Sequence, residues 1–475
     1  MIFNSVTFLI FIAAFLPVYF ALNGRQRLWW SLLGSYFFYG WWDWRFLTLI
    51  VISTMVDFYL GLQISKLDEP SRRKRMLIFS MVLNLGFLGF FKYFNFFVDS
   101  FHQMLLSFGL QPSIHTLHII LPVGISFYTF QSMSYTIDVY RRGIAVEPDF
   151  LRFATFIAFF PQLVAGPIVR ASELLPQFNK DQRFKWDRFT SGTGQILWGF
   201  FKKVAVADSL APFVDQCFDA PGAFSSMHLL VGVVFYSFQI YCDFSGYSDI
   251  AIGLARIMGY DFPINFRTPY FSKNFSEFWT RWHITLSSWL RDYLYISLGG
   301  NRKGTLMTYR NLMLTMLLGG LWHGASWVFV FWGFLHGAYL VVQRLAGPGF
   351  RRLLDAMHLP KFAIDGLNIA LVYFFTCLAW IFFRSPDFST ATTVIERIAS
   401  FENFTLGSIV NKFWLMKGIL LVGLLLLVEI ADFRFDFGEV IRRSPVFRVA
   451  SFAVLLWLIA LLGTFDSNAF IYFQF

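Results

Sequence analysis

His323 is an ionisable residue inside a strongly apolar run at residues 317–327. Ionisable groups are costly inside a membrane and are usually retained for a function. An imidazole, whose ordinary pKa lies near neutrality, can act there as a general base or as a proton relay. A buried, hydrogen-bonded histidine without a chemical role is the alternative that the residue types leave open. Gly320 and Gly324 form a GxxxG pair that lets another helix approach closely.

A second histidine, His336, follows His323 by 13 residues. On one continuous helix this spacing corresponds to about 220° of rotation, so the two side chains would face different ways and would be a poor metal pair. The cysteines also lack pairing or metal spacing, and we expect no metal site. They are Cys217, Cys242 and Cys377.

The apolar region at residues 227–257 contains a polar stretch. Its polar side chains are Gln239, Asp243, Ser245 and Asp249. Because charged groups inside a membrane segment are rare, they predict either the lining of a substrate tunnel or a polar knot that joins two helices.

Residues 275–303 combine aromatic and cationic side chains. Trp279, Trp282, Trp289 and Tyr293 recur at helical spacing, with Arg281, Arg291 and Asp292 between them. The pattern predicts an amphipathic helix at the cytoplasmic interface that dips inward. The Gly-rich turn that follows could hold a phosphorylated ligand through backbone N–H groups and two cations, although a plain cytoplasmic loop has the same composition. Its polar residues are Asn301, Arg302 and Lys303.

The composition places these residues in a membrane protein. Of 475 residues, 56% are apolar and only 14% are charged, against about 25% charged in an ordinary soluble domain. A soluble fold cannot hide so much apolar surface, so a cytosolic enzyme, a nucleic-acid binder and a disordered chain are excluded. The net charge of +10 fits an excess of Lys and Arg in cytoplasmic loops.

About 11 stretches are long and apolar enough to span a bilayer. The first, at residues 3–22, lacks a preceding cation and a cleavage site, so we expect a retained helix. The others are 28–42, 46–64, 76–98, 119–139, 193–215, 227–257, 311–343, 366–383, 412–430 and 449–465. Two of them, 227–257 and 311–343, are long enough for more than one crossing.

Basic loops predict the orientation. Residues 65–75 hold five Lys and Arg side chains and should be cytoplasmic, which puts the N-terminus outside. The apolar stretch 151–169 lies between two basic segments and is interrupted by two X-Pro pairs, so we expect a re-entrant element buried in protein. The same conflict at 311–343 predicts a fold-back. No inverted repeat is visible, which disfavours a secondary transporter.

Four stretches resemble the membrane-bound O-acyltransferases (MBOAT proteins). They are residues 121–131 (LPVGISFYTFQ), residues 159–168 (FFPQLVAGPI), the segment from Asn265 to Arg302, and LWHG ending at Gly324. The resemblance covers nearly the whole chain, and residues 470–475 match as well. It is closest to the bacterial branch that includes the membrane subunits of alginate O-acetylation (the AlgI type) and of teichoic acid D-alanylation (the DltB type).

This resemblance implies an all-α bundle around a tunnel or funnel. The whole chain, 1–475, would be one membrane domain, with N-terminal spans at 1–140, a catalytic core at 141–345 and C-terminal spans at 346–475. The family's invariant histidine corresponds to His323 and its second site residue to His283. Further residues expected near the substrates are Gln239, Asp243, Ser245, Asn265, Lys273, Trp279, Arg281, Trp282, Ser287, Arg291, Asn301, Arg302, Trp322, Ser326 and His336.

The resemblance also implies an activity. Acetyl-CoA would approach from the cytoplasm as donor, with no permanently bound cofactor, and His323 would take the proton of an acceptor hydroxyl. The acceptor would be an SGNH-like partner protein outside the bacterial inner membrane, which passes the acetyl group to a polysaccharide such as alginate. Alternatives are another acyl or D-alanyl donor, a lipid or peptidoglycan acceptor, a proton-coupled transporter and a scaffold without chemistry.

Overall fold

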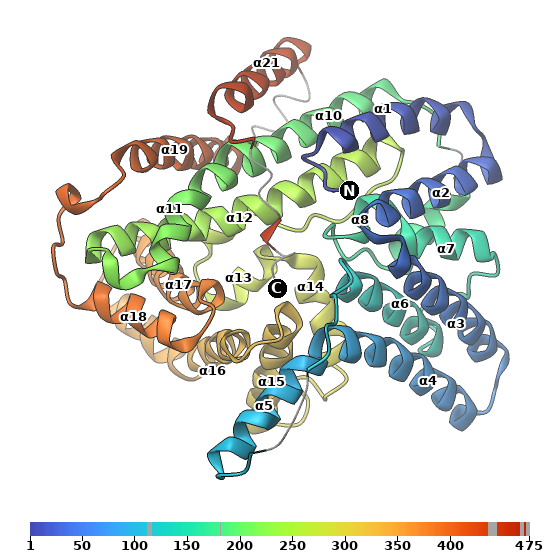
Figure 1. Cartoon of the computed structure of the whole chain (residues 1–475), viewed down its shortest axis with the longest axis horizontal. Coiled ribbons are helices and arrows are strands. Elements are labelled where there is room, and N and C mark those ends of the chain that lie inside the picture. The colour runs from blue at the N-terminus through green and yellow to red at the C-terminus, as the bar shows by residue number, and fades with distance from the viewer. Residues whose placement is uncertain (112–115, 181, 436–443, 466–469, 472–475) are drawn as a thin grey trace. The chain divides into compact units, whose positions relative to one another are not determined.

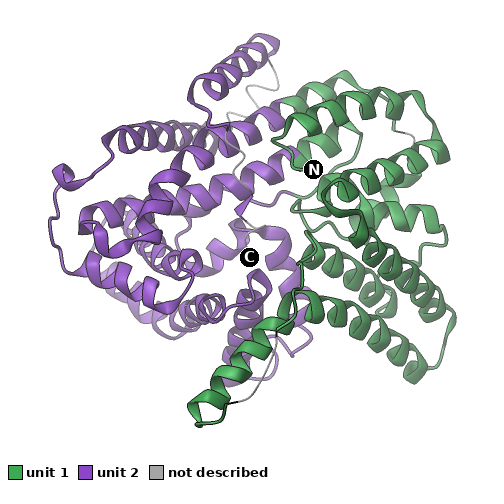
Figure 2. Cartoon of the chain, in the orientation of Figure 1, with its two compact units in different colours: residues 1–193, 251–263 green, residues 194–250, 264–475 purple. Residues whose placement is uncertain are grey.

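A computed structural model describes residues 1–111, 116–180, 182–435, 444–465 and 470–471. The described residues form helices and no strands, which confirms the predicted all-α class (Figure 1). The chain divides into two compact units (Figure 2). Unit 1 comprises residues 1–193 and 251–263, and unit 2 comprises residues 194–250 and 264–475.

Unit 1 contains the first nine α-helices. They are α1 (Val6–Ala21), α2 (Gly24–Asp43), α3 (Leu47–Lys66), α4 (Pro70–Leu88), α5 (Phe94–Ser107), α6 (Ile125–Tyr140), α7 (Phe150–Ala158), α8 (Phe160–Leu163) and α9 (Ala171–Leu174). Two further helices, α10 (Trp186–Phe200) and α12 (Ser226–Ile257), contribute residues to both units.

Unit 2 holds the remaining helices that the structure describes. They are α11 (Asp208–Asp219), α13 (Phe275–Arg281), α14 (Ile284–Trp289), α15 (Thr305–His323), α16 (Trp327–Ala356), α17 (Lys361–Arg384), α18 (Phe388–Ala399), α19 (Lys412–Phe435) and α21 (Pro445–Leu462).

Seven helical runs among the described residues are long and apolar enough to cross a membrane. The first, Gly24–Lys66, contains two of the predicted spans, separated by a short 3₁₀ turn at Trp44–Phe46. The 227–257 region forms the single helix α12. The chain is therefore a multi-pass membrane protein, while the expected number of about 11 spans is not confirmed.

Helices α3, α4 and α6 of unit 1 meet at a buried carboxylate. Asp57 on α3 is fully buried and accepts hydrogen bonds from Ser80 (2.5 Å), Asn84 (2.7 Å) and Ser132. Ser80 and Asn84 belong to α4, and Ser132 belongs to α6. A buried polar group is tolerated only with such partners, so this cluster joins the three helices.

The predicted interruption at 151–169 is confirmed. Helix α7 ends at Ala158, and α8 begins two residues later, because the backbone leaves the helical conformation at Phe159 (φ −56°, ψ 111°). The backbone N–H of Phe160 donates to the Ser35 hydroxyl at 3.0 Å, and the Gln162 amide donates to the Phe156 carbonyl at 2.5 Å. Irregular backbone at this position is thus satisfied by the protein itself.

Helices α15 and α16 form the fold-back that the sequence predicts at 311–343. A Cβ added to Gly320 would meet the Gly333 Cα at 3.1 Å and would overlap the Phe329 carbonyl. The two backbones therefore touch where only glycine fits, as small residues allow between membrane helices. This contact places the C-terminal end of α15 directly beside the start of α16.

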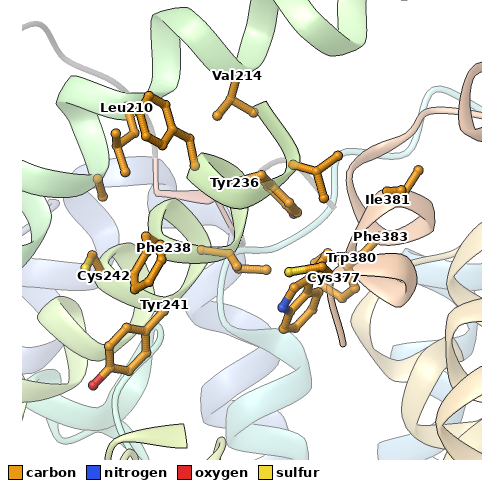
Figure 3. Packing of buried hydrophobic residues seen from close by; sticks show 14 of the residues in the cluster. Leu210, Val214, Tyr236, Phe238, Tyr241, Cys242, Cys377, Trp380, Ile381 and Phe383 are labelled. Carbon is orange, nitrogen blue, oxygen red and sulfur yellow. The ribbon is translucent and has the colours of Figure 1, made fainter. Parts of the chain in front are cut away.

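Aromatic and aliphatic side chains from α11, α12 and α17 make the core of unit 2 (Figure 3). Tyr236, Phe238 and Tyr241 of α12 share this core with Trp380 and Phe383 of α17. Large aromatic side chains fix their neighbours by shape as well as by buried area. The histidines described below lie against this core.

Candidate active site

His323 is the last residue of α15, immediately before the turn into α16. Its ring is 4% exposed and lies edge-on to three aromatic rings. The ring centroids of Trp322 and Trp332 are each 5.1 Å away, and that of Phe383 is 5.4 Å away. The close contact of α15 with α16 at Gly320 and the three aromatic rings together fix the position of the His323 imidazole.

His283 lies at a break between two short helices, so the predicted continuous amphipathic helix at residues 275–295 is wrong. Helix α13 ends at Arg281, and α14 begins at Ile284. Between them His283 adopts a left-handed conformation with φ +41°. A non-glycine residue in this conformation is unusual and is held there by its surroundings.

Asn265 supplies the contacts that hold this break. Its backbone carbonyl accepts from the Ile284 N–H at 2.9 Å. Its side-chain Oδ1 lies 3.1 Å from His283 Nδ1, 2.9 Å from the Thr285 hydroxyl and 3.3 Å from the Thr285 N–H. A neighbour 18 residues earlier in the chain therefore overrides the local helical pattern.

These contacts fix the tautomer of His283. A backbone N–H can only donate, so the atom of Asn265 that faces Thr285 is the carbonyl oxygen, which can only accept. His283 Nδ1 must therefore carry a proton, and Nε2 carries the lone pair. Burial lowers the pKa of His283 to about 3, which keeps the ring neutral near pH 7. His283 Nε2 is thus an acceptor of hydrogen bonds.

The two histidines implied by the resemblance lie next to each other. The ring centroids of His283 and His323 are 6.4 Å apart, and the Trp322 ring lies 6.0 Å from His283. One acceptor molecule can contact both imidazoles at this separation, since each hydrogen bond adds about 3 Å. The pair can therefore bind an acceptor molecule and remove the proton of its hydroxyl.

His336 belongs to the same aromatic group but lies on α16. Its ring is fully buried, with Trp332 at 4.7 Å, Trp279 at 5.0 Å and Phe278 at 5.8 Å between ring centroids. Among the described residues, neither nitrogen of His336 has a hydrogen-bond partner, and the same holds for the indole nitrogens of Trp279 and Trp332. Buried polar groups are nearly always satisfied, so this group can take polar atoms of a ligand or of water.

Asp243 and Asp249 on α12 are engaged with two buried lysines. Lys203 lies 2.6 Å from Asp243, and Lys202 lies 2.5 Å from Asp249. Asp243 also accepts from the Ile471 N–H at 2.8 Å. Of the two alternatives that the sequence allowed for these carboxylates, the structure thus shows the polar knot that joins helices. Neither lysine is among the residues predicted from the sequence, although two lysines within the apolar run 193–215 indicate nearby carboxylates.

The other expected residues occupy two kinds of position in unit 2. Buried or half-buried are Gln239, Ser245, Trp279, Trp282, Ser287, Trp322 and Ser326. At the surface, Lys273 pairs with Asp365 (2.7 Å) and Arg291 with Asp292 (2.7 Å), while the half-buried Arg281 pairs with Glu277 (2.8 Å). Asn301 and Arg302 are exposed in a turn that depends on positive φ at Gly299 and Gly300.

Comparison with known proteins gives a family and several relatives. A model of the membrane-bound O-acyltransferase family (MBOAT) matches residues 37–383. A probable alginate O-acetylase, AlgI, of Pseudomonas aeruginosa is 42% identical over 90% of this chain and 81% of its own length. A peptidoglycan O-acetyltransferase of Helicobacter pylori is 38% identical over 84% of this chain and 80% of its own length.

A more distant relative is a teichoic acid D-alanyltransferase of Streptococcus thermophilus, 31% identical over 49% of this chain and 60% of its own length. The matched family region includes both His283 and His323, whose rings the structure brings together. The chain therefore belongs to the membrane-bound O-acyltransferase family and is an O-acyltransferase of the membrane.

Proposed function

We propose that the protein transfers an acetyl group from acetyl-CoA to a hydroxyl group, for O-acetylation of a polysaccharide outside the cytoplasm. The observation that carries this proposal is the pair of adjacent, buried imidazoles of His283 and His323. Relatives named alginate O-acetylase and peptidoglycan O-acetyltransferase support the acetyl group and a glycan as final acceptor.

His323 is the general base in this reaction. It takes the proton of the acceptor hydroxyl, whose oxygen forms the new ester bond with the acetyl carbonyl carbon. The carbon–sulfur bond of the thioester breaks, and the proton leaves with the sulfur as the thiol of CoA, so the transfer is balanced. A positioned base accelerates such a step by roughly 10²–10⁴.

His283 orients the acceptor. Since Asn265 holds the Nδ1 proton, Nε2 can accept a hydrogen bond from a second O–H or N–H group of the acceptor, because the single proton of the reacting hydroxyl goes to His323. The same geometry disfavours His283 as a donor to the oxyanion. The acceptor molecule is then held by His283, while His323 removes the proton of its reacting hydroxyl.

We place the pantetheine arm of the donor, acetyl-CoA, beside His336. The unsatisfied nitrogens of His336, Trp279 and Trp332 offer polar contacts for the amides of the pantetheine arm. The exposed cations Arg302 and Lys303, together with Lys273 and Arg281 from the preceding segment of unit 2, are the candidates for the phosphates of CoA. The predicted orientation puts these cations on the cytoplasmic side, where acetyl-CoA is available.

A partner protein completes the proposal. An SGNH-like protein beyond the inner membrane would accept the acetyl group and pass it to the polysaccharide. The support for this step is the resemblance to the bacterial polysaccharide-modification branch, together with the predicted external N-terminus and cytoplasmic basic loops.

The test is transfer of labelled acetyl groups from acetyl-CoA in sealed native membranes that retain partners. We expect release of free CoA and label in a macromolecule, whose isolation identifies alginate, peptidoglycan or a protein as acceptor. We expect that the protein does not accept a D-alanyl thioester as donor when it is offered in a parallel reaction. Label that crosses the membrane without CoA release would favour a transporter, and equal transfer by His323→Ala would overturn the role of the base.

A further inference from the structure

A basic pocket lies within unit 1, apart from the residues assigned to the transfer reaction. Its volume is about 320 Å³, and it is formed where four segments of the chain meet. These are residues 23–28 at the start of α2, Asp149 and Arg152 at the start of α7, residues 178–180 with Gln182, and Tyr260.

The charge of this pocket is one-sided. Four cations line it, Arg25, Arg27, Arg152 and Lys180, and the only carboxylate among the described lining residues is Asp149. Asp149 contacts Arg25 at 3.2 Å and also accepts from the Leu151 N–H at 2.9 Å. One carboxylate cannot neutralise four cations, so the pocket favours an anion.

Two of the cations have capacity for a ligand. Lys180 is exposed and has no ion-pair partner in the part of the chain that the structure describes. Arg152 reaches Glu147 only at 4.0 Å, and its Nε is buried without a hydrogen-bond partner among the described residues. An arginine and a lysine in this state suit phosphate oxygens, which accept several charge-assisted hydrogen bonds.

Hydrogen bonds within the protein hold one wall of the pocket. Arg27 is 5% exposed and donates to the Tyr19 carbonyl at 3.0 Å and to the Leu22 carbonyl at 2.5 Å. Tyr19 in turn donates to the Met258 carbonyl at 2.8 Å. A preformed cavity of this volume lies at the small end of known ligand sites and accommodates a phosphate with a glycerol unit.

The surroundings of the pocket favour a lipid over a soluble phosphate ester. Phe184 and Trp186 follow Gln182 in the chain and expose 49% and 64% of their surface, and Val18, which exposes 38%, precedes Tyr19, whose carbonyl accepts from Arg27. Tryptophan at the level of lipid headgroups and exposed apolar residues beside it are typical of a membrane interface. The charge pattern predicts a cytoplasmic position for Arg25, Arg27 and Lys180, and anionic lipids bind clustered cations on that side of a membrane.

We propose that this pocket binds the phosphate-bearing headgroup of an anionic phospholipid. The phosphate contacts Arg152 and Lys180, the glycerol lies against the Phe178 and Tyr260 rings, which are 5.2 Å apart, and the acyl chains cover the exposed apolar residues. The inference is independent of the transfer chemistry proposed above.

The test is lipid binding to the purified full-length protein in a neutral detergent, measured by native mass spectrometry. Dioleoyl phosphatidylglycerol is compared with dioleoyl phosphatidylcholine, and glycerol 3-phosphate provides the soluble arm. We expect preferential retention of phosphatidylglycerol. The variant Arg152→Gln/Lys180→Gln should weaken it roughly 30-fold, because two cations at a lipid headgroup are lost.

The matched control is Arg142→Gln/Lys185→Gln, which removes the same charge from exposed residues outside the pocket and should change binding less than about threefold. Equal retention of both lipids would overturn the proposal, as would an equal loss in the control. Binding of glycerol 3-phosphate through the same residues, without lipid, would overturn the lipid assignment. Thermal denaturation of both variants verifies that they are folded.

Discussion

Asp57 in unit 1 and His336 in unit 2 are both fully buried polar residues on helices with the length and composition of membrane spans. Asp57 receives three hydrogen bonds from two neighbouring helices, whereas the nitrogens of His336 have no partner among the described residues. The first arrangement stabilises packing. The second leaves hydrogen-bonding capacity beside His323, where the proposed reaction needs it. Both residues are equally buried, so burial does not distinguish them. A buried polar group with hydrogen-bond partners inside the protein is structural, whereas one without them can bind a ligand.

The largest effect is expected for His323→Ala. Loss of the base should lower acetyl transfer by at least about a hundredfold while the protein stays folded. The measurement is the initial rate of CoA release at equal amounts of folded protein. His228→Gln is the matched control, because His228 is also buried in unit 2 but is stacked between Phe213 and Phe224. If the control loses as much activity, the distinction between the two kinds of histidine fails.

Asn265 provides a sharper test through its conservative variant. Asn265→Leu removes the acceptor that fixes the His283 tautomer and should lower kcat/KM by about 10–100-fold, as losses of groups that orient a functional histidine often do. Asn265→Asp keeps an acceptor oxygen and should retain activity within about tenfold. Equal activity of the leucine variant and the wild type would show that the tautomer of His283 has no role.

The variant Asp57→Leu tests whether the hydrogen-bonded Asp57 cluster has only a structural role. Three donors lose their acceptor, and at about 0.6 kcal/mol for each hydrogen bond in a membrane the protein should be destabilised by roughly 2 kcal/mol. Transfer per folded molecule should stay unchanged. Thermal denaturation in detergent measures the first quantity, with Thr54→Val as control, because the Thr54 hydroxyl on the same helix has no partner among the described residues. Loss of activity in folded Asp57→Leu would place this cluster in the reaction.

The smallest effect is expected for His336→Phe. The variant keeps an aromatic ring but removes both nitrogens, so the KM for acetyl-CoA should rise about three- to tenfold with little change in kcat. Steady-state kinetics at varied acetyl-CoA separates the two parameters. An unchanged KM, together with a gain in thermal stability, would contradict a contact between His336 and acetyl-CoA. The two nitrogens would then only lack hydrogen-bond partners.

The structural features that depend on a local sequence pattern could be predicted from the sequence. Interruption at 151–169 follows from two X-Pro pairs, and the fold-back at 311–343 follows from basic residues on both flanks. The pairing of His283 with His323 was expected only from the family resemblance, because residues 40 apart give no distance by themselves.

The contacts that set the details are distant in sequence. The helical periodicity at residues 275–295 is real, yet Asn265 and the left-handed His283 break the helix there. Likewise, a lysine beside a carboxylate is visible only after α12 is folded against the helical run that carries Lys202 and Lys203. Tertiary contacts override local propensity at these positions.

The contact between Asp243 and Ile471 has a consequence for biosynthesis. The two residues are 228 positions apart, and Phe470 packs against Phe244, whose ring lies 4.6 Å from His283. At roughly 5–20 residues per second, a ribosome needs on the order of 10–50 s to reach Ile471 after Asp243 has been made. During that interval the surroundings of His283 are incomplete, so a nascent chain with its histidines already synthesised is not yet a finished enzyme.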